Sequence, residues 1–311
     1  MADITSSHLG TTKEPYRRLW CELTTKCQLE CVMCYNDSGP HRGHDAMTSK
    51  DWLNVIDQAA ALRIRMAQFI GGEPTLHPGF TRIMAHALNM GLDVEVYSNL
   101  VHITTEMWDL FQSPRVSLAF SYFASDPAAH NAVTRRPSHA ATRRNAETAA
   151  RLGIPIRAGV IDFGHTRGAL ADLKSIGITM TSSDRVRRIG RGGSGTPAPS
   201  ELCGHCGQDA VAVGADGDIS PCVFTRWLTA GNVRDTSLAD ILGGPGMATA
   251  LAAIPARSLR SRGSEDSDDN DGSYQPIEAC SPDQPTSDPS CNPDSPTSPA
   301  PTCNPYERGS W

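Results

Sequence analysis

The 311-residue sequence contains no apolar run of membrane-spanning length and no long basic stretch. The first absence argues against a membrane protein. The second, together with a net charge of −6 at pH 7, argues against nucleic acid as a main partner. The N-terminal extension, residues 1–16, is polar and lacks the apolar core of a signal peptide. We therefore expect a cytoplasmic protein, long enough for one large domain and a smaller one.

Cysteine is plentiful, with 10 residues, and in a reducing compartment this favours metal ligands over disulfides. Cys27, Cys31 and Cys34 form a C-x3-C-x2-C triplet. Three thiolates hold three irons of a [4Fe–4S] cluster and leave the fourth iron open, whereas ferredoxin runs normally add a fourth cysteine. A structural zinc site usually pairs two C-x2-C knuckles or combines Cys with His, and no second knuckle lies nearby. The triplet therefore predicts an iron–sulfur cluster with an open iron.

The triplet and the later segment Gly71-Gly72-Glu73-Pro74 resemble the radical S-adenosylmethionine (SAM) enzymes. The resemblance implies that the open iron holds the amino and carboxylate groups of SAM. An electron, supplied by a donor such as ferredoxin or flavodoxin, then cleaves SAM to a 5′-deoxyadenosyl radical that abstracts hydrogen from the substrate. The resemblance also implies that the backbone of residues 71–74 binds the methionyl amino group, and glycines permit such a close approach.

The resemblance also indicates further SAM contacts. Met33 stands where many members carry an aromatic residue near the adenine, and methionine is apolar and polarizable enough to pack there. Ser98-Asn99 resembles the polar pair that contacts the ribose. In a related subgroup, a serine at the position of Ser121 and an arginine about twenty residues later bind the SAM carboxylate as a fork. This spacing indicates Arg143, with three competitors, Arg135, Arg136 and Arg144.

Residues 17–190 read as alternating strands and helices. Strands are predicted at 19–24, 66–70, 93–97, 116–121, 155–161 and 178–181, and helices near 48–60, 80–89, 105–111, 140–152 and 167–175. Such alternation favours an α/β fold with a parallel sheet and helices outside it. The resemblance implies a partial (β/α)6 TIM-like barrel. The cluster loop, Gly71–Glu73 and Ser98-Asn99 all fall at the carboxyl ends of strands, where such barrels place active residues.

A second cysteine group follows a glycine-rich break at residues 190–195, within a segment that spans residues 200–255. Cys203, Cys206 and Cys222, with a C-x10-G-x4-C spacing between the last two, resemble the auxiliary-cluster hairpin of the SPASM and twitch subfamilies. A zinc ribbon is the alternative. No compact C-x2-C-x5-C run follows Cys222, so one auxiliary [4Fe–4S] cluster is expected. Its fourth ligand is Cys280 or the substrate.

The tail, residues 256–311, is rich in Ser, Pro, Asp and Asn and has few apolar residues. We expect it to be disordered because it cannot bury enough apolar surface to fold unaided. It carries Cys280, Cys291 and Cys303, of which the last two are expected to be free thiols.

Fold does not choose function. Among relatives with an auxiliary cluster, many crosslink or oxidise ribosomally made peptides, so the resemblance implies a peptide maturase. Few residues precede the cluster loop, so we expect a separate leader-peptide-binding protein or direct barrel contacts. The alternatives are a twitch-type dehydrogenase or modifier of a small molecule, such as an aminocyclitol or a sugar, and a non-enzymatic metal-binding protein.

Overall fold

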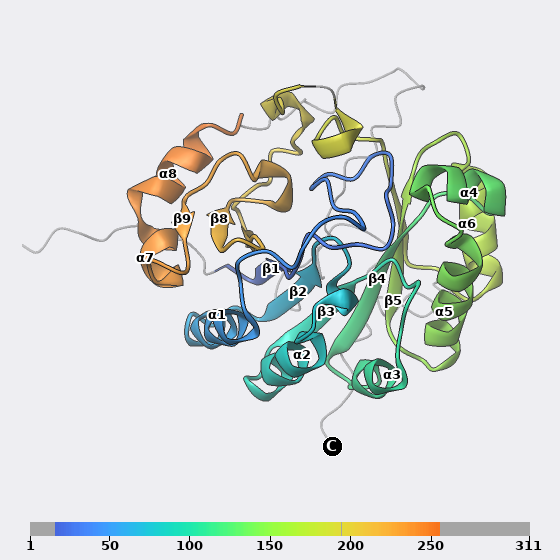
Figure 1. Ribbon diagram of the computed structural model, residues 1–311, viewed down its shortest axis with the longest axis horizontal. Helices are drawn as coiled ribbons and strands as arrows, with labels where there is room; N and C mark the ends of the chain where they lie inside the picture. Colours follow the sequence, from blue (N-terminus) through green and yellow to red (C-terminus); the bar gives the residue numbers. More distant parts are fainter. Residues whose placement is uncertain (1–15, 194, 256–311) are drawn as a thin grey trace, which may run out of the picture. The chain divides into compact units, whose positions relative to one another are not determined.

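The computed structural model describes residues 16–193 and 195–255. The described strands form one sheet in the order β6-β5-β4-β3-β2-β1-β7-β8-β9 (Figure 1). Its first six strands run parallel to their neighbours. They are β1 (Arg18–Glu22), β2 (Met66–Ile70), β3 (Asp93–Tyr97), β4 (Val116–Tyr122), β5 (Ile156–Ile161) and β6 (Thr181–Asp184). The predicted parallel sheet is confirmed.

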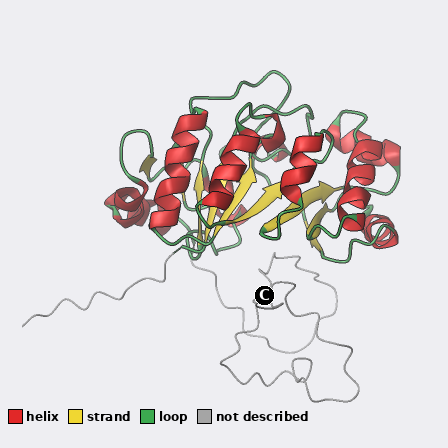
Figure 2. Ribbon diagram, turned by 90° about the horizontal axis from the view of Figure 1, so that it is seen from below, coloured by secondary structure: helices red, strands yellow, loops and turns green. Residues whose placement is uncertain are grey.

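Six helices connect these strands and lie along the outer side of the curved sheet (Figures 1 and 2). They are α1 (Ser49–Ala61), α2 (Phe80–Asn89), α3 (Thr105–Phe111), α4 (Pro127–Thr134), α5 (His139–Arg151) and α6 (Thr166–Ser175). At the start of α1, the helix predicted near 48–60, Thr48 and Asp51 form a capping box, in which each side chain accepts a hydrogen bond from the other residue's backbone N–H. No helix in the described part of the chain is long and apolar enough to span a membrane.

Two elements differ from the sequence predictions. Helix α4 was not predicted, although Asp126 caps it and Pro127 occupies its first turn, a combination that favours a helix start. The last strand was predicted at 178–181 but begins at Thr181. The apolar signal came from Ile178, which is buried because it packs in the core directly after α6, where its N–H donates to Leu173 O.

The two faces of the sheet differ in polarity. Leu19, Cys21 and Leu23 are fully buried in the large core beneath the helices, with Trp52 among the largest side chains there. Cys21 is thus a core residue. Side chains that point the other way along the strands are more often polar, such as Glu22. The inner face therefore supplies the chemistry, while the outer face supplies the apolar burial.

The C-terminal segment continues the same sheet. Strand β7 (Ala210–Val213) pairs in parallel with β1 and forms an antiparallel hairpin with β8 (Asp218–Ser220), which pairs with β9 (Gly231–Asn232). The predicted strand–turn–strand is thus confirmed. Helices α7 (Leu238–Gly243) and α8 (Pro245–Ala252) follow. Because β7 joins β1 directly, the sheet runs across the predicted division between residues 17–190 and 200–255. The tail calls, including Cys280, Cys291 and Cys303, lie outside the described residues, as do residues 1–15.

Phe69 provides a test of the outer core. Its ring is fully buried and contacts Phe80, with ring centroids 6.3 Å apart. Phe69→Ala should lower the free energy of unfolding by about 3–5 kcal/mol because it leaves a cavity. Met180→Ala, at a side chain that is 40% exposed, should change it by about 0.5 kcal/mol or less. Urea unfolding of the reconstituted protein measures both, and similar values for the two variants would contradict the described packing.

Candidate functional site

The first cysteine triplet lies in the loop after β1. Cys27 is buried, and Cys31 and Cys34 are partly buried. Backbone N–H groups donate to two of the sulfurs, from Leu29 to Cys27 Sγ at 3.4 Å and from Ser38 to Cys34 Sγ at 3.3 Å. Such hydrogen bonds to sulfur tune iron–sulfur clusters. The loop therefore places three thiols at the carboxyl edge of the parallel strands, with backbone N–H groups beside two of them.

The segment after β2 packs directly against this loop. Gly72 N–H donates to Thr24 O at 2.7 Å, and Glu73 N–H donates to Lys26 O at 2.9 Å. Gly71 has a φ of +133°, a conformation that favours glycine. A Cβ at Gly72 would lie 2.8 Å from the carbonyl carbon of Lys26. The two glycines therefore allow the backbone at the end of β2 to pack directly against the backbone of the cluster loop.

Glu73 connects this segment to the end of β3. Its side chain is fully buried and accepts hydrogen bonds from Thr75 N–H and Oγ1, from Ser98 Oγ at 2.8 Å and from Asn99 N–H at 2.7 Å. Burial raises the pKa of Glu73, and these donors oppose the rise. Asn99 in turn places its Nδ2 atom 3.6 Å from Cys27 Sγ. The structure thus brings Glu73, Ser98 and Asn99 together beside the first triplet, with the Ser98 hydroxyl committed to Glu73.

Ser121 lies on the inner face of β4 within a polar network. Its hydroxyl is 3.2 Å from the hydroxyl of Tyr97, and the Arg157 guanidinium lies over the Tyr97 ring at 5.5 Å. Arg157 also donates two hydrogen bonds to Glu95, at 2.7 and 2.9 Å. Burial would raise the pKa of Glu95, but these bonds and the charge of Arg157 hold it below its usual value. The network fixes a charged pair inside the barrel.

The structure does not bring Arg143 to Ser121. Tyr122 follows Ser121 along β4 and therefore points to the opposite face of the sheet. Its hydroxyl donates to Asp172 at 2.5 Å, and Arg143 donates to the same carboxylate from Nε at 3.1 Å and from Nη2 at 3.0 Å. Arg143 thus has a carboxylate partner on the helical side. Its role toward SAM stays a prediction that this geometry does not support.

One of the competing arginines does lie beside the cluster loop. Glu30 and Val32 donate their N–H groups to Thr134 O and Val133 O at the end of α4. Arg136, in the following turn, is 3.4 Å from the Glu30 carboxylate. Met33 lies in the same loop, partly exposed.

Arg191 is a site residue that the sequence reasoning missed. It lies in the predicted glycine-rich break, yet its side chain donates to Cys31 O at 3.0 Å, Asp37 Oδ1 at 2.8 Å and Ser38 O at 2.6 Å. Its N–H donates to Cys34 O at 2.9 Å. Gly190 lies so close that a Cβ there would collide with the carbonyl oxygen of Cys34. Residues 190–191 therefore hold the cluster loop in place, and we call the contacts of Arg191 with this loop the Arg191 clamp. In the sequence, only the repeated glycines indicated close packing here.

The second cysteine triplet lies at the hairpin. Gly207 N–H donates to Pro221 O at 2.9 Å, which brings Cys206 and Cys222 together at the open ends of β7 and β8. Both are buried, and Cys203 is partly buried. The three thiols contact one another in sequence, because Cys203 shares a hydrogen bond with Cys206 and Cys206 shares one with Cys222. His205 stays exposed beside Gln208.

An aromatic contact joins the two triplets. Tyr35, next to Cys34, packs edge-on against Phe224, two residues after Cys222, with ring centroids 5.2 Å apart. Trp20 and Ile70 pack against the small group of buried side chains that includes Cys206 and Cys222. The two triplets are therefore neighbours across an apolar seam on the inner face of the sheet.

The donor set fits iron–sulfur clusters. All seven described cysteines are free thiols. Burial, and then the neighbouring Cys34, raise the pKa of Cys31 to about 12, so the Cys31 thiol is not a thiolate on its own. A bound metal deprotonates coordinating thiols outright. No group of three or more His, Cys, Asp or Glu among the described residues is arranged to hold one metal ion. A [4Fe–4S] cluster differs because several irons separate its ligands, so its thiols need not converge on one point.

Comparison with known families agrees with this site. Residues 21–174 match the family model of the radical SAM superfamily, and residues 203–281 match that of an iron–sulfur cluster-binding domain, SPASM. The chain belongs to the radical SAM superfamily, in its SPASM subfamily. Membership implies iron–sulfur clusters and SAM as cofactors. The second match includes Cys280, whose role as a ligand stays a prediction.

Curated relatives of this radical SAM protein include a peptide cyclase and a maturase. A PqqA peptide cyclase from Streptomyces rochei is 28% identical over 141 residues, which cover 45% of this chain and 39% of the relative. A mycofactocin maturase, MftC, from Mycobacterium ulcerans (strain Agy99) is 27% identical over 183 residues, which cover 58% of this chain and 49% of the relative. The matches thus span less than half of the length of each of these relatives.

Solved structures confirm the fold. Streptococcus suis SuiB bound to its precursor peptide SuiA superposes with a TM-score of 0.65 at 13% identity, covering 78% of this chain and 68% of that chain. At this identity the likeness concerns the fold alone, and it supports the partial barrel followed by a smaller C-terminal part.

The glycine contact between β2 and the cluster loop is testable. In Gly72→Ala the added Cβ would displace the loop, because its nearest neighbours are backbone atoms of Lys26. We expect SAM affinity to fall about tenfold or more, as overpacking costs about 1–3 kcal/mol. Gly243→Ala is the matched control, since nothing lies within 4 Å of its added Cβ. Equilibrium dialysis with SAM measures both, and an unchanged affinity in Gly72→Ala would contradict the close contact.

The Arg191 clamp predicts a loss of iron from the first site. Arg191→Ala removes three hydrogen bonds to the cluster loop, two of them to backbone carbonyls. The loop should then hold its cluster less firmly, and iron content after anaerobic desalting should fall. Arg185→Ala, in the same segment but 59% exposed and paired with Glu201, should keep the wild-type iron content. Equal iron in the two variants would show that the clamp does not support the site.

Proposed function

We propose that this protein is a peptide maturase that cleaves SAM reductively and crosslinks or oxidises a ribosomally made peptide. The observation that carries the proposal is the placement of two cysteine triplets on one face of the sheet, joined through Tyr35 and Phe224. The names of the two relatives, a peptide cyclase and a maturase, support the choice of substrate class. So does the likeness in fold to SuiB with its bound precursor peptide.

The chain's own residues divide the work. Cys27, Cys31 and Cys34 would hold a [4Fe–4S] cluster with an open iron, and Cys203, Cys206 and Cys222 would hold an auxiliary [4Fe–4S] cluster, with Cys280 or the substrate as a further ligand. When bound, the first cluster and SAM supply the 5′-deoxyadenosyl radical that abstracts hydrogen from the peptide. The backbone of residues 71–74 would bind the amino group of SAM.

Two features of the described residues suit this role. Asn99 places its Nδ2 atom near Cys27 Sγ, and its N–H donates to the buried Glu73 carboxylate. Glu73 therefore fixes the residue that we expect to contact the ribose of SAM. The apolar seam formed by Trp20, Tyr35 and Phe224 lies between the two triplets. Orientation and solvent exclusion are the protein's contribution to cofactor-driven radical chemistry. An electron donor such as ferredoxin or flavodoxin and a separate leader-peptide-binding protein complete the proposed partners.

The test compares wild type with Cys27→Ala/Cys31→Ala/Cys34→Ala after anaerobic reconstitution. The variant should lose 5′-deoxyadenosine formation entirely yet keep about four irons in cubane form, visible by Mössbauer spectroscopy. Loss of all iron from the variant would contradict the auxiliary cluster. Formation of 5′-deoxyadenosine by the variant would contradict the assignment of the first triplet as the site of the SAM-binding cluster.

The substrate class has its own test. Wild type incubated with SAM, a reductant and the peptides encoded beside its gene should produce a peptide whose mass reflects loss of hydrogen. Uncoupled SAM cleavage with every peptide, but hydrogen loss from a sugar or aminocyclitol, would replace the peptide substrate by a small molecule.

A further inference from the structure

A small pocket lies where the end of β1 meets the turn of the β7–β8 hairpin. Its volume is about 180 Å³, and it is lined by Glu22, Gly214, Asp216, Asp218, Ser220 and Arg226. Glu22 ends β1 just before the cluster loop, and Arg226 follows the short helical turn that begins after Cys222. The pocket therefore borders both cysteine triplets, and the roles described so far leave it unused.

Glu22 presents an unused acceptor to this pocket. The residue is only 1% exposed. Its Oε1 accepts from the Tyr35 hydroxyl at 2.9 Å and from Asn36 Nδ2 at 3.5 Å. Its Oε2 is buried and has no hydrogen-bond partner among the described residues, although Arg226 Nε lies 3.4 Å away as an ion pair. A buried carboxylate oxygen without a donor is costly, which points to a donor that binds from outside.

The rest of the lining is also rich in acceptors. Asp216 and Asp218 add two carboxylates, so the pocket holds three acidic side chains against one guanidinium. Gly214 lies close beside them, since a Cβ there would lie 2.6 Å from Asp216 Oδ1. The Ser220 hydroxyl donates to Cys222 O at 3.0 Å, which leaves its oxygen as an acceptor. The formal charge of the lining is therefore negative, and hydrogen-bond donors are scarce.

The size of the pocket limits its occupant. Sites for whole small molecules usually measure about 300–1,000 Å³, while a water molecule occupies about 30 Å³. A pocket of about 180 Å³ accommodates a head group and part of its stem. Arg226 alone would attract an anion, but its guanidinium already faces Glu22 and donates to Asn36 O at 3.4 Å. Charge and size together favour a single cationic group.

We propose that this pocket binds the ammonium or guanidinium group of a basic side chain of the peptide substrate. Glu22 Oε2 accepts one hydrogen bond from that group, and Asp216 and Asp218 contribute further charge at the mouth. The inference rests on the proposed peptide maturase function, because it assigns the pocket as the subsite for a lysine or arginine close to the modified position.

The experiment measures binding of blocked pentapeptides to the reconstituted holoprotein by anaerobic calorimetry. The peptides have four glycines and a central lysine, norleucine or glutamate. Lysine should bind at least about tenfold more tightly than norleucine, since charge-assisted hydrogen bonds are the strong ones. Equal binding of lysine and norleucine, tighter binding of glutamate, or no binding of any peptide would overturn the proposal.

Substitutions connect the preference to the pocket. Asp216→Asn and Glu22→Gln should each weaken lysine-peptide binding about tenfold and leave norleucine-peptide binding unchanged. Asp216 is exposed, and the one donor to its carboxylate within residues 16–193 and 195–255 is Asp218 N–H in the hairpin turn. Its variant should therefore keep the fold even if Glu22→Gln disturbs Tyr35. A full lysine preference in Asp216→Asn would refute the assignment.

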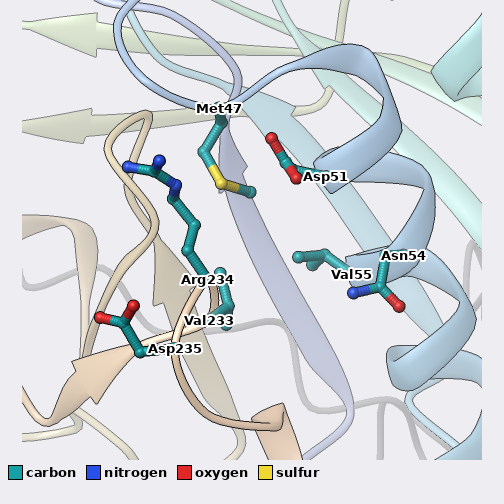
Figure 3. A pocket seen from close by; sticks show the side chains of 7 residues that line it. All are labelled: Met47, Asp51, Asn54, Val55, Val233, Arg234 and Asp235. Atoms are coloured by element: carbon teal, nitrogen blue, oxygen red, sulfur yellow. The ribbon is translucent and has the colours of Figure 1, made fainter.

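The control makes the same charge change elsewhere in the C-terminal segment. Asp235 lines a different hollow, between α1 and the connection from β9 to α7, together with Met47, Asp51 and Arg234 (Figure 3). Asp235→Asn should bind all three peptides as wild type does. 5′-Deoxyadenosine formation, measured on the same samples, separates the two proposals: SAM cleavage without a lysine preference refutes the pocket alone, whereas loss of SAM cleavage in wild type refutes the proposed function.

Discussion

The structure depends on the pairing of β1 with neighbours on both sides. β1 pairs in parallel with β2, in a register that sets Glu22 beside Ile70, and with β7, in a register that sets Trp20 beside Ala212. The first pairing brings the glycines after Ile70 against the cluster loop. The second brings the hairpin and its cysteines to the inner face near Trp20. A one-residue slip in either register would turn the inner side chains outward, so both sites depend on the same strand.

Three buried glutamates then fix the polar interior, each in a different way. Glu73 is satisfied by four donors from neutral groups, Glu95 by Gln68 and the guanidinium of Arg157, and Glu22 by Tyr35 and Asn36 at only one of its oxygens. A fully bonded carboxylate orients its neighbours and is itself unavailable to ligands. Glu73 and Glu95, whose carboxylates are fully bonded, therefore orient the residues of the site. Glu22 keeps one carboxylate oxygen that can accept a hydrogen bond from a ligand. Preorganised polar groups of this kind act strongly in a site that excludes water.

The sequence predicted the elements whose signals are local. The capping pair Thr48 and Asp51, the strand Met66–Ile70 and the turn glycine before β8 each carry their own pattern, and the structure confirms them. It misplaced β6, because Ile178 is buried by α6 and not by strand pairing.

Site residues that are defined by long-range contacts could not be predicted from local sequence patterns. Arg191 contacts a loop about 160 positions earlier in the chain, and no motif marks it. Arg143 was selected by spacing, and spacing along the chain does not say which face of α5 meets Asp172.

The Arg191 clamp also has a consequence for the order of assembly. During synthesis, the three cysteines of the first triplet emerge well before Arg191, which anchors their loop, and before β7, which completes the flank of β1. Chains are made from the N-terminus, so the loop lacks the Arg191 contacts while the barrel is still being translated. The loop therefore has all of its contacts only after residue 191 has been made.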